Sequence, residues 1–181
     1  MNCSILLAGF GGQGILSAGR FIASAALTEG KEVCWFPSYG PEMRGGTANC
    51  GVIVSDKTIG SPFITEADAL VAMNSPSLEK FSEIVKPGGL IIIDSTLARP
   101  IHTRTDVQWI SIPASELAAE QGNIAYAIII LLGCLIRQTG LVGRESFSRA
   151  LFENLPLRHH HLIPAEMAAF DQGGNYAVGR D

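Results

Sequence analysis

In SILLAGFGGQG, residues 4–14, a short apolar run leads directly into a glycine turn, and this segment predicts the architecture of the whole chain. The run Ser4–Ala8 has the length and composition of a buried strand. The segment Ile15–Thr28 carries apolar residues at helical spacing, and Gly30 is placed to end it. A strand, a glycine turn and a helix in this order predict the first unit of an α/β fold.

Alternating strand and helix patterns continue along the rest of the chain. Pro37 is expected to end the second strand, and a helix beginning near Ser75 is expected to end before Pro87. The glycines from Gly173 onward suggest a loose tail or a docking arm. The alternation predicts a Rossmann-like three-layer sandwich, a mostly parallel sheet with helices on both faces, in a single domain over residues 1–181. Further strands are expected at 33–36, 48–54, 69–73, 90–94 and 107–112, and further helices at 115–120, 124–138, 145–154 and 164–170.

The composition narrows the classes of partner. Hydrophobic residues make up 47% of the 181 residues and charged residues 17%, and the net charge is −4. Nucleic acid and anionic membrane surfaces are therefore not expected as partners, because the chain has no basic run. The apolar run Ile124–Ile136 is shorter than the roughly 20 residues that span a bilayer, and the N-terminus lacks the features of an export signal. We expect a cytoplasmic protein with apolar surface that another subunit, or a second copy, covers.

Neither the cysteines nor the histidines predict a metal site. The four cysteines, Cys3, Cys34, Cys50 and Cys134, are widely spaced, which is typical of buried reduced thiols rather than zinc or iron–sulfur ligands. Three adjacent histidines follow Arg158, but adjacent side chains share no face of a helix or strand. They are interpreted as surface imidazoles.

The glycine turn itself matches the pattern G-x-G-x-x-G at Gly9–Gly14. Glycines permit a tight turn, and the following helix offers unpaired N–H groups to an anion. A dinucleotide site also needs an acid after the second strand, and Cys34–Pro37 supplies none. Two interpretations stay open beside dinucleotide binding: contact with a phosphate or other anion, and glycines that only allow close packing.

A second glycine-rich stretch, PSYGPEMRGG at Pro37–Gly46, combines a tyrosine, an acid and an arginine. A loop after the second strand of a parallel sheet lies at the carboxyl edge, beside the first glycine turn, where ligands bind. Taken alone, the stretch is equally compatible with an ordinary connection that leaves its arginine in solvent.

The two glycine stretches together resemble the gamma subunit of 2-oxoacid:ferredoxin oxidoreductases. The resemblance covers about residues 3 to 140 and is closest to the 2-oxoglutarate branch, by the form EMRGGTAN at Glu42–Asn49. The chain departs from the family where an Asn often precedes a Leu-Gly pair, because Ala127–Gly133 is wholly apolar here. The matching motifs are GFGGQG at 9–14, PSYGPEMRGG at 37–46, VSD at 54–56, IGSP at 59–62 and KPGGLIIID at 86–94.

The resemblance implies a complex that decarboxylates a 2-oxoacid, passes electrons to ferredoxin and forms an acyl-coenzyme A. Thiamine diphosphate, magnesium and iron–sulfur clusters are expected on partner subunits of alpha, beta and delta type, since this chain shows no motif for them. The isolated chain is expected to be inactive. Its part would be to place coenzyme A and to close the active site, with residues that bind an anion or face another subunit: Gly11, Gly12, Gln13, Gly14, Ser38, Tyr39, Arg44 and Gly45.

Other polar and aromatic residues have structural interpretations. Asp94 and Asn74 follow strand ends, where capping of the next turn or helix is the default and ligand contact the alternative. Trp35 and Trp109 are expected as core or interface anchors. Two other functions remain open for the chain: a stand-alone nucleotide-binding oxidoreductase of Rossmann type, and a purely structural scaffold subunit.

Overall fold

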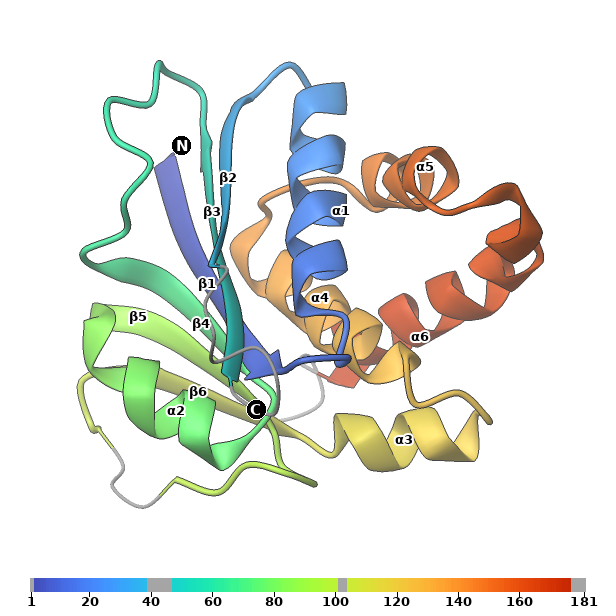
Figure 1. Cartoon of the computed structure of the whole chain (residues 1–181). Coiled ribbons are helices and arrows are strands. Elements are labelled where there is room, and N and C mark those ends of the chain that lie inside the picture. The colour runs from blue at the N-terminus through green and yellow to red at the C-terminus, as the bar shows by residue number, and fades with distance from the viewer. Residues whose placement is uncertain (1, 39–46, 101–103, 177–181) are drawn as a thin grey trace.

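The computed structural model describes residues 2–38, 47–100 and 104–176. A six-stranded sheet in the order β2-β3-β1-β4-β5-β6 runs through the middle of the molecule (Figure 1). The strands are β1 (Asn2–Phe10), β2 (Glu32–Ser38), β3 (Thr47–Ser55), β4 (Ala67–Ala72), β5 (Val85–Asp94) and β6 (Gln108–Ile112). The helices are α1 (Ile15–Thr28), α2 (Ser75–Phe81), α3 (Ala114–Glu120), α4 (Tyr126–Thr139), α5 (Arg144–Asn154) and α6 (Ile163–Tyr176), with short 3₁₀ turns at Ser82–Ile84 and Leu157–Leu162.

The sheet is mostly parallel, as predicted, with one reversed strand. β1, β4, β5 and β6 pair in parallel, whereas β3 lies antiparallel between β1 and β2. Two reversals restore the direction, so β2 runs the same way as β1. The carboxyl ends of these two strands therefore lie at the same edge of the sheet.

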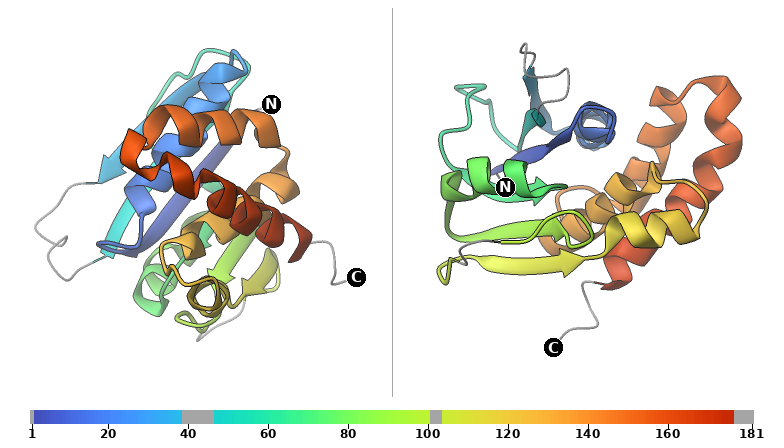
Figure 2. Two further views of the ribbon diagram at one scale, coloured as in Figure 1. Left: turned by 90° about the vertical axis from the view of Figure 1, so that its right-hand side faces the viewer. Right: turned by 60° about the horizontal axis from the view of Figure 1, so that its bottom comes forward.

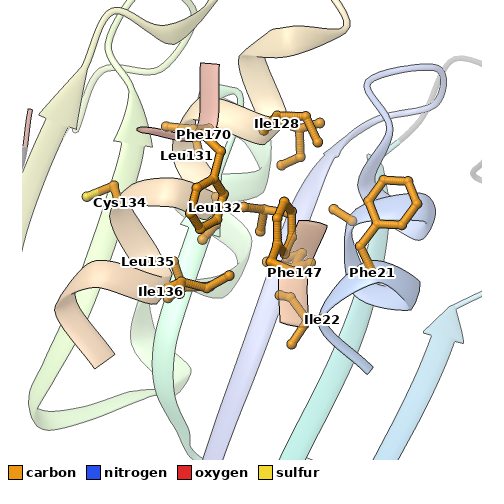
Figure 3. Packing of buried hydrophobic residues seen from close by; sticks show 14 of the residues in the cluster. Phe21, Ile22, Ile128, Leu131, Leu132, Cys134, Leu135, Ile136, Phe147 and Phe170 are labelled. Atoms are coloured by element: carbon orange, nitrogen blue, oxygen red, sulfur yellow. The ribbon is translucent and has the colours of Figure 1, made fainter. Parts of the chain in front are cut away.

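Helices cover both faces, which confirms the predicted sandwich, but the two faces are covered unequally. The larger core packs α1 and α4 against one face, with α5 and α6 outside them (Figure 2). In this layer the ring of Phe147 lies 6.4 Å from Phe21 and 4.5 Å from Phe170, between centroids (Figure 3). The smaller core lies under α2, which contacts β1 and β4 on the opposite face.

The prediction of a loose tail from Gly173 onward is wrong as far as Tyr176, because α6 continues to that residue. The glycines here permit a close helix crossing. A Cβ on Gly133 would lie 1.9 Å from the carbonyl oxygen of Phe170, and a Cβ on Gly173 would lie 1.8 Å from that of Ile130. Only hydrogen fits at these positions, so Gly133 and Gly173 let α4 and α6 touch through their backbones.

Two predicted strand boundaries are also wrong. Pro37 lies within β2, paired with Cys50, and a proline is tolerated there because β2 is an edge strand whose outer side needs no ladder bond. β5 begins at Val85 and includes Pro87, where the pairing with β4 changes register. In both places the strand continues through a proline, a residue that usually ends a strand. The helices of the described residues include none with the length and apolar character to cross a bilayer.

Candidate functional site

The glycine turn lies between β1 and α1, as the sequence predicted. Gly12 and Gly14 have φ angles of 90° and 79°, a left-handed conformation that other residues adopt at a cost. The N–H of Gln13 donates to the carbonyl of Phe10 at 3.2 Å and closes the turn. A Cβ built on Gly12 meets no atom of the described residues within 4 Å, so none of these residues packs against the backbone here.

The side chain of Gln13 folds inward and fixes the turn. Its Oε1 accepts from the N–H of Phe10 at 2.6 Å and lies 3.4 Å from the Nδ2 of Asn74. A Cβ on Gly9 would lie 2.7 Å from this oxygen, so Gly9 makes room for it. Gln13 therefore ties the turn to the end of the neighbouring strand, a structural role that the spacing of glycines did not indicate.

Asn74 is the other end of this link and also caps α2. Its Oδ1 accepts from the N–H of Ser77 at 2.8 Å, which confirms the capping role expected from sequence. α1 leaves β1 toward one face of the sheet, and α2 leaves β4 toward the other. The turn thus lies at a topological switch point, the part of an open α/β sheet where ligands bind.

The N-terminus of α1 is suited to an anion. No side chain within the described ranges caps the helix, and its first turn carries no acid. The first N–H groups of a helix have no intrahelical partner, and the dipole places partial positive charge there. An anionic group at this end of α1 would accept hydrogen bonds from these N–H groups and would be attracted by the partial positive charge.

The stretch between β2 and β3 begins and ends beside the turn. Ser38 pairs with Asn49 on β3, and Thr47 pairs with Phe10 at the end of β1. The two glycine-rich segments therefore meet the same edge, as expected from sequence. Three of the predicted site residues, Tyr39, Arg44 and Gly45, lie outside the described residues.

Two cavities flank the turn, and Gly12 lines both. The smaller, of about 330 Å³, opens toward β3 and includes Gly11, Ser17 and Ala48 in its lining. The larger, of about 620 Å³, opens toward α3 and the start of α4. Its walls are mostly apolar, and its lining residues are Gly12, Gln13, Met73, Thr96, Leu97, Ser115, Glu116, Ala119, Ile124, Ala125 and Ala127.

Asp94 supports the wall of the larger cavity. The carboxylate is fully buried and accepts from the Oγ of Ser115 at 2.5 Å, from the N–H of Ser115 at 3.2 Å and from the N–H of Thr96 at 3.1 Å. These bonds join the end of β5 to the first turn of α3. The capping interpretation of Asp94 is therefore confirmed.

Three of the four thiols, those of Cys3, Cys50 and Cys134, are held in their protonated form by burial. Burial raises the pKa of Cys3 to about 11 and that of Cys134 to about 12. Burial likewise raises the pKa of Cys50 to about 12, and this thiol donates to the carbonyl oxygen of Ile15 at 3.3 Å. Protonated buried thiols are poor metal ligands and nucleophiles.

The central residue of the histidine tract, His160, has a structural role. His160 Nε2 lies 2.9 Å from the carbonyl oxygen of Leu155, and its ring centroid lies 4.4 Å from that of Phe152. No group of three or more His, Cys, Asp or Glu residues suited to a metal occurs in the described part of the chain.

Comparison with known proteins places this architecture in a family. The family model for pyruvate ferredoxin/flavodoxin oxidoreductase matches residues 4–176, which include the glycine turn and all of the described strands and helices except the first two residues of β1. The chain belongs to this family. The resemblance seen in the glycine stretches is thereby confirmed.

Curated relatives in the family are subunits of 2-oxoacid oxidoreductases. Ketoisovalerate oxidoreductase subunit VorA of Methanothermobacter thermautotrophicus is 44% identical over 149 residues, which cover 81% of this chain and 31% of VorA. This chain therefore spans about a third of that relative. 2-Oxoglutarate synthase subunit KorC of Methanocaldococcus jannaschii is 36% identical, with 86% of this chain and 85% of KorC covered.

Solved structures agree with this placement. The gamma subunit of a keto/oxoacid ferredoxin oxidoreductase from Geobacter sulfurreducens superposes with a TM-score of 0.84 at 30% identity, over 97% of this chain and 98% of that one. A 2-oxoglutarate:ferredoxin oxidoreductase from Magnetococcus marinus gives a TM-score of 0.90 at 26% identity. That structure contains 2-oxoglutarate, coenzyme A and succinyl-CoA, and the match covers 99% of this chain and 32% of that chain.

Proposed function

We propose that this chain is the gamma-type subunit of a 2-oxoacid:ferredoxin oxidoreductase complex and that its glycine turn places coenzyme A. The observation that carries the proposal is the turn itself: an uncapped helix N-terminus at the switch point, with no described residue packed against Gly12 and a cavity on either side. Coenzyme A carries a diphosphate and a ribose 3′-phosphate, and backbone amides at such a helix end suit a phosphate group.

The chemistry of the reaction is assigned to sister subunits of alpha, beta and delta type. Thiamine diphosphate with magnesium and iron–sulfur clusters supply decarboxylation and electron transfer when bound. The described residues do not fit an iron–sulfur cluster, because the cysteines are dispersed and three of the four have raised pKa values. Among these residues there is also no group of three or more His, Cys, Asp or Glu that could hold magnesium. Decarboxylation and electron transfer are therefore assigned to cofactors on the sister subunits.

An exposed apolar patch supports docking against such a subunit. Phe36 and Phe63 are 48% and 68% exposed, and their rings lie 5.7 Å apart. The pairing of Phe36 with Gly51, and of Gly51 with Leu6, places Phe36 on the sheet face that carries α2. Exposed aromatic clusters of this kind are typical of interfaces.

The first test compares two glycine variants of the reconstituted complex. Gly12→Ala puts a methyl group onto the turn, in a conformation that costs about 1–2 kcal/mol. Gly30→Ala is the matched control, because Gly30 has a φ angle of 73°, likewise no described atom within 4 Å of an added Cβ, and a place at the opposite end of α1. We expect similar losses of stability, but a raised KM for coenzyme A only in Gly12→Ala.

Arg44→Ala tests the second glycine stretch in the same assay. Arg44 is proposed to pair with a phosphate of coenzyme A or with a carboxylate of another subunit, and Ser38 and Tyr39 to line the path toward the reacting centre. Loss of a charge-assisted contact would raise the KM for coenzyme A about tenfold or more. An unchanged KM would remove Arg44 from the site, and unchanged values in both Arg44→Ala and Gly12→Ala would overturn the proposal.

The proposed oxoacid is 2-oxoglutarate, in keeping with the loop Glu42–Asn49 and the KorC relatives. The 44% identity with VorA favours a second candidate, the branched 2-oxoacid ketoisovalerate. Oxoacid-dependent reduction of ferredoxin by the complex, measured with 2-oxoglutarate, ketoisovalerate and pyruvate, separates these candidates. A kcat/KM highest for pyruvate would refute both.

A further inference from the structure

β2 forms an open edge of the sheet. It stands last in the strand order, and within the described residues it pairs with β3 alone (Figure 1). Native proteins usually protect such an edge with charged side chains, bulges or a very short strand, because its free N–H and carbonyl groups can pair with another strand. β2 has seven residues, an unbroken register with β3 and one charged side chain, that of Glu32. Its outer edge is therefore suited to the addition of a strand.

The position of Pro37 identifies the backbone groups of β2 that point outward. Residues of an antiparallel pair alternate between positions that exchange two hydrogen bonds and positions that exchange none. Pro37 has no N–H, so its pair with Cys50 is of the second kind, and the period of two puts Val33 and Trp35 in the same class. The N–H and carbonyl groups of Val33 and Trp35, and the carbonyl of Pro37, therefore face the outer edge.

These outward groups are complementary to those of a second copy of the chain. Trp35 is the central residue of β2, so antiparallel pairing with the partner's Trp35 overlaps the two strands along their whole length. The two tryptophans exchange both of their hydrogen bonds, and each Val33 N–H donates to the carbonyl of the partner's Pro37. The lack of a donor on Pro37 leaves only the carbonyl of Val33 to solvent. Glu32 lies opposite the partner's Ser38, so no charge opposes a like charge.

The side chains along the edge suit the same pairing. Val33 and Trp35 pack on the larger core, whereas Phe36 lies on the opposite face, and so does Cys34, two residues before it. Phe36 is about half exposed and Cys34 is partly exposed. With the tryptophans paired, Phe36 lies opposite the partner's Cys34 in a pair without hydrogen bonds, where side chains approach most closely. Apolar surface that one copy leaves in water is thus covered by the other.

We propose that the outer edge of β2 binds a second copy of this chain, antiparallel and with Trp35 opposite the partner's Trp35, so that the two sheets join edge to edge. The interface is isologous, since the same edge serves both copies. The two-fold axis of such a pair is perpendicular to the sheet, so the faces that carry α2 lie on the same side of the dimer. The inference goes beyond the proposed function and does not rest on it.

Sedimentation equilibrium of the full chain measures the association. The unmodified chain is expected to dimerise, and Phe36→Lys, which puts a charge on each side of the seam, is expected to raise the dissociation constant about tenfold or more. Leu157→Lys is the matched control, because Leu157 is 84% exposed and lies in the turn between α5 and α6, away from the sheet. Circular dichroism checks that both variants fold. A chain that is monomeric at every concentration, or equal effects of the two lysines, would overturn the proposal.

A disulfide cross-link tests the register. Opposed residues in a pair without hydrogen bonds have Cα atoms about 4.5 Å apart, within the range of roughly 4.4–6.8 Å that a disulfide spans. Phe36→Cys, oxidised with glutathione disulfide, is therefore expected to form a covalent dimer through the partner's Cys34. The same change combined with Cys34→Ser is expected to form none. The unmodified chain should also form none, because its two Cys34 residues lie on a diagonal, about 7–8 Å apart.

The outcomes distinguish the second copy from other occupants of the edge. If Phe36→Cys gives no covalent dimer where the unmodified chain is dimeric, or if the unmodified chain cross-links as fast, the register is wrong. If the chain alone stays monomeric but Phe36→Lys weakens assembly with the sister subunits, the edge belongs to a strand of a sister subunit and the proposal fails. None of these results involves the KM for coenzyme A, so the proposed function is tested separately.

Discussion

At the crossing of α4 and α6, replacing a glycine by alanine is predicted to destabilise the chain at Gly133 but to stabilise it at Gly174. A Cβ on Gly133 would lie 1.9 Å from the carbonyl oxygen of Phe170, whereas ordinary van der Waals contact begins at 3.4 Å. Gly133→Ala therefore forces the two helices apart by more than about 1 Å and loosens the stacking of Phe170 on Phe147. Overpacking of this kind costs about 3 kcal/mol.

Gly174→Ala is the matched comparison on the other helix. The nearest atom to a Cβ on Gly174 is the carbonyl oxygen of Gly133 at 3.6 Å, which is ordinary contact. Alanine is favoured over glycine inside a helix by about 0.5–1 kcal/mol. Gly174→Ala is therefore expected to stabilise the chain slightly, although it lies next to Gly173, where the same change would meet backbone at 1.8 Å.

Thermal unfolding followed by circular dichroism checks both variants. For a chain of this size 1 kcal/mol shifts Tm by about 2–4 °C, so Gly133→Ala should lower Tm by about 6–12 °C. Gly174→Ala should raise Tm by about 1–4 °C. Equal shifts in the two variants, or a Gly133→Ala chain as stable as the wild type, would refute the backbone contact between α4 and α6.

Two further predictions concern ionisation. Burial opposes the charge on Asp68, but hydrogen bonds from Lys86 and Ser4 outweigh this effect and hold the pKa of Asp68 below its usual value. The ionised carboxylate therefore stabilises the folded chain at pH values above the ordinary Asp pKa of about 3.9, and this stabilisation is lost as pH falls below that value. Asp68→Asn should lower the urea midpoint more at pH 7 than at pH 2.5, and an equal deficit at both would contradict this origin. The buried thiols of Cys3, Cys50 and Cys134 have pKa values of about 11 to 12 and should therefore resist a disulfide reagent at pH 8. At most the half-buried Cys34 should react before urea is added. Rapid labelling of any of the other three in the native chain would contradict their burial.

Elements whose signals are local could be predicted from the amino-acid sequence alone. The apolar run at Ser4–Ala8, the helical spacing of Ile15–Thr28 and the stop at Gly30 each depend on residues within a few positions of one another. The glycine turn was likewise recognisable, because its tight backbone needs glycine in any surroundings. These local features, with the second glycine stretch, were enough to indicate the family.

Features that depend on residues far apart in the chain became visible only in the folded structure. Pro37 stays in a strand because β2 is at the edge of the sheet, and Gly173 stays in a helix because α4 passes at backbone contact. Gln13 looked like one residue of an anion-binding turn, but only the fold brings Asn74 to its side chain. The larger cavity joins residues from positions 12 to 127, and no local pattern shows a pocket whose walls come together only when the sheet and its helices pack.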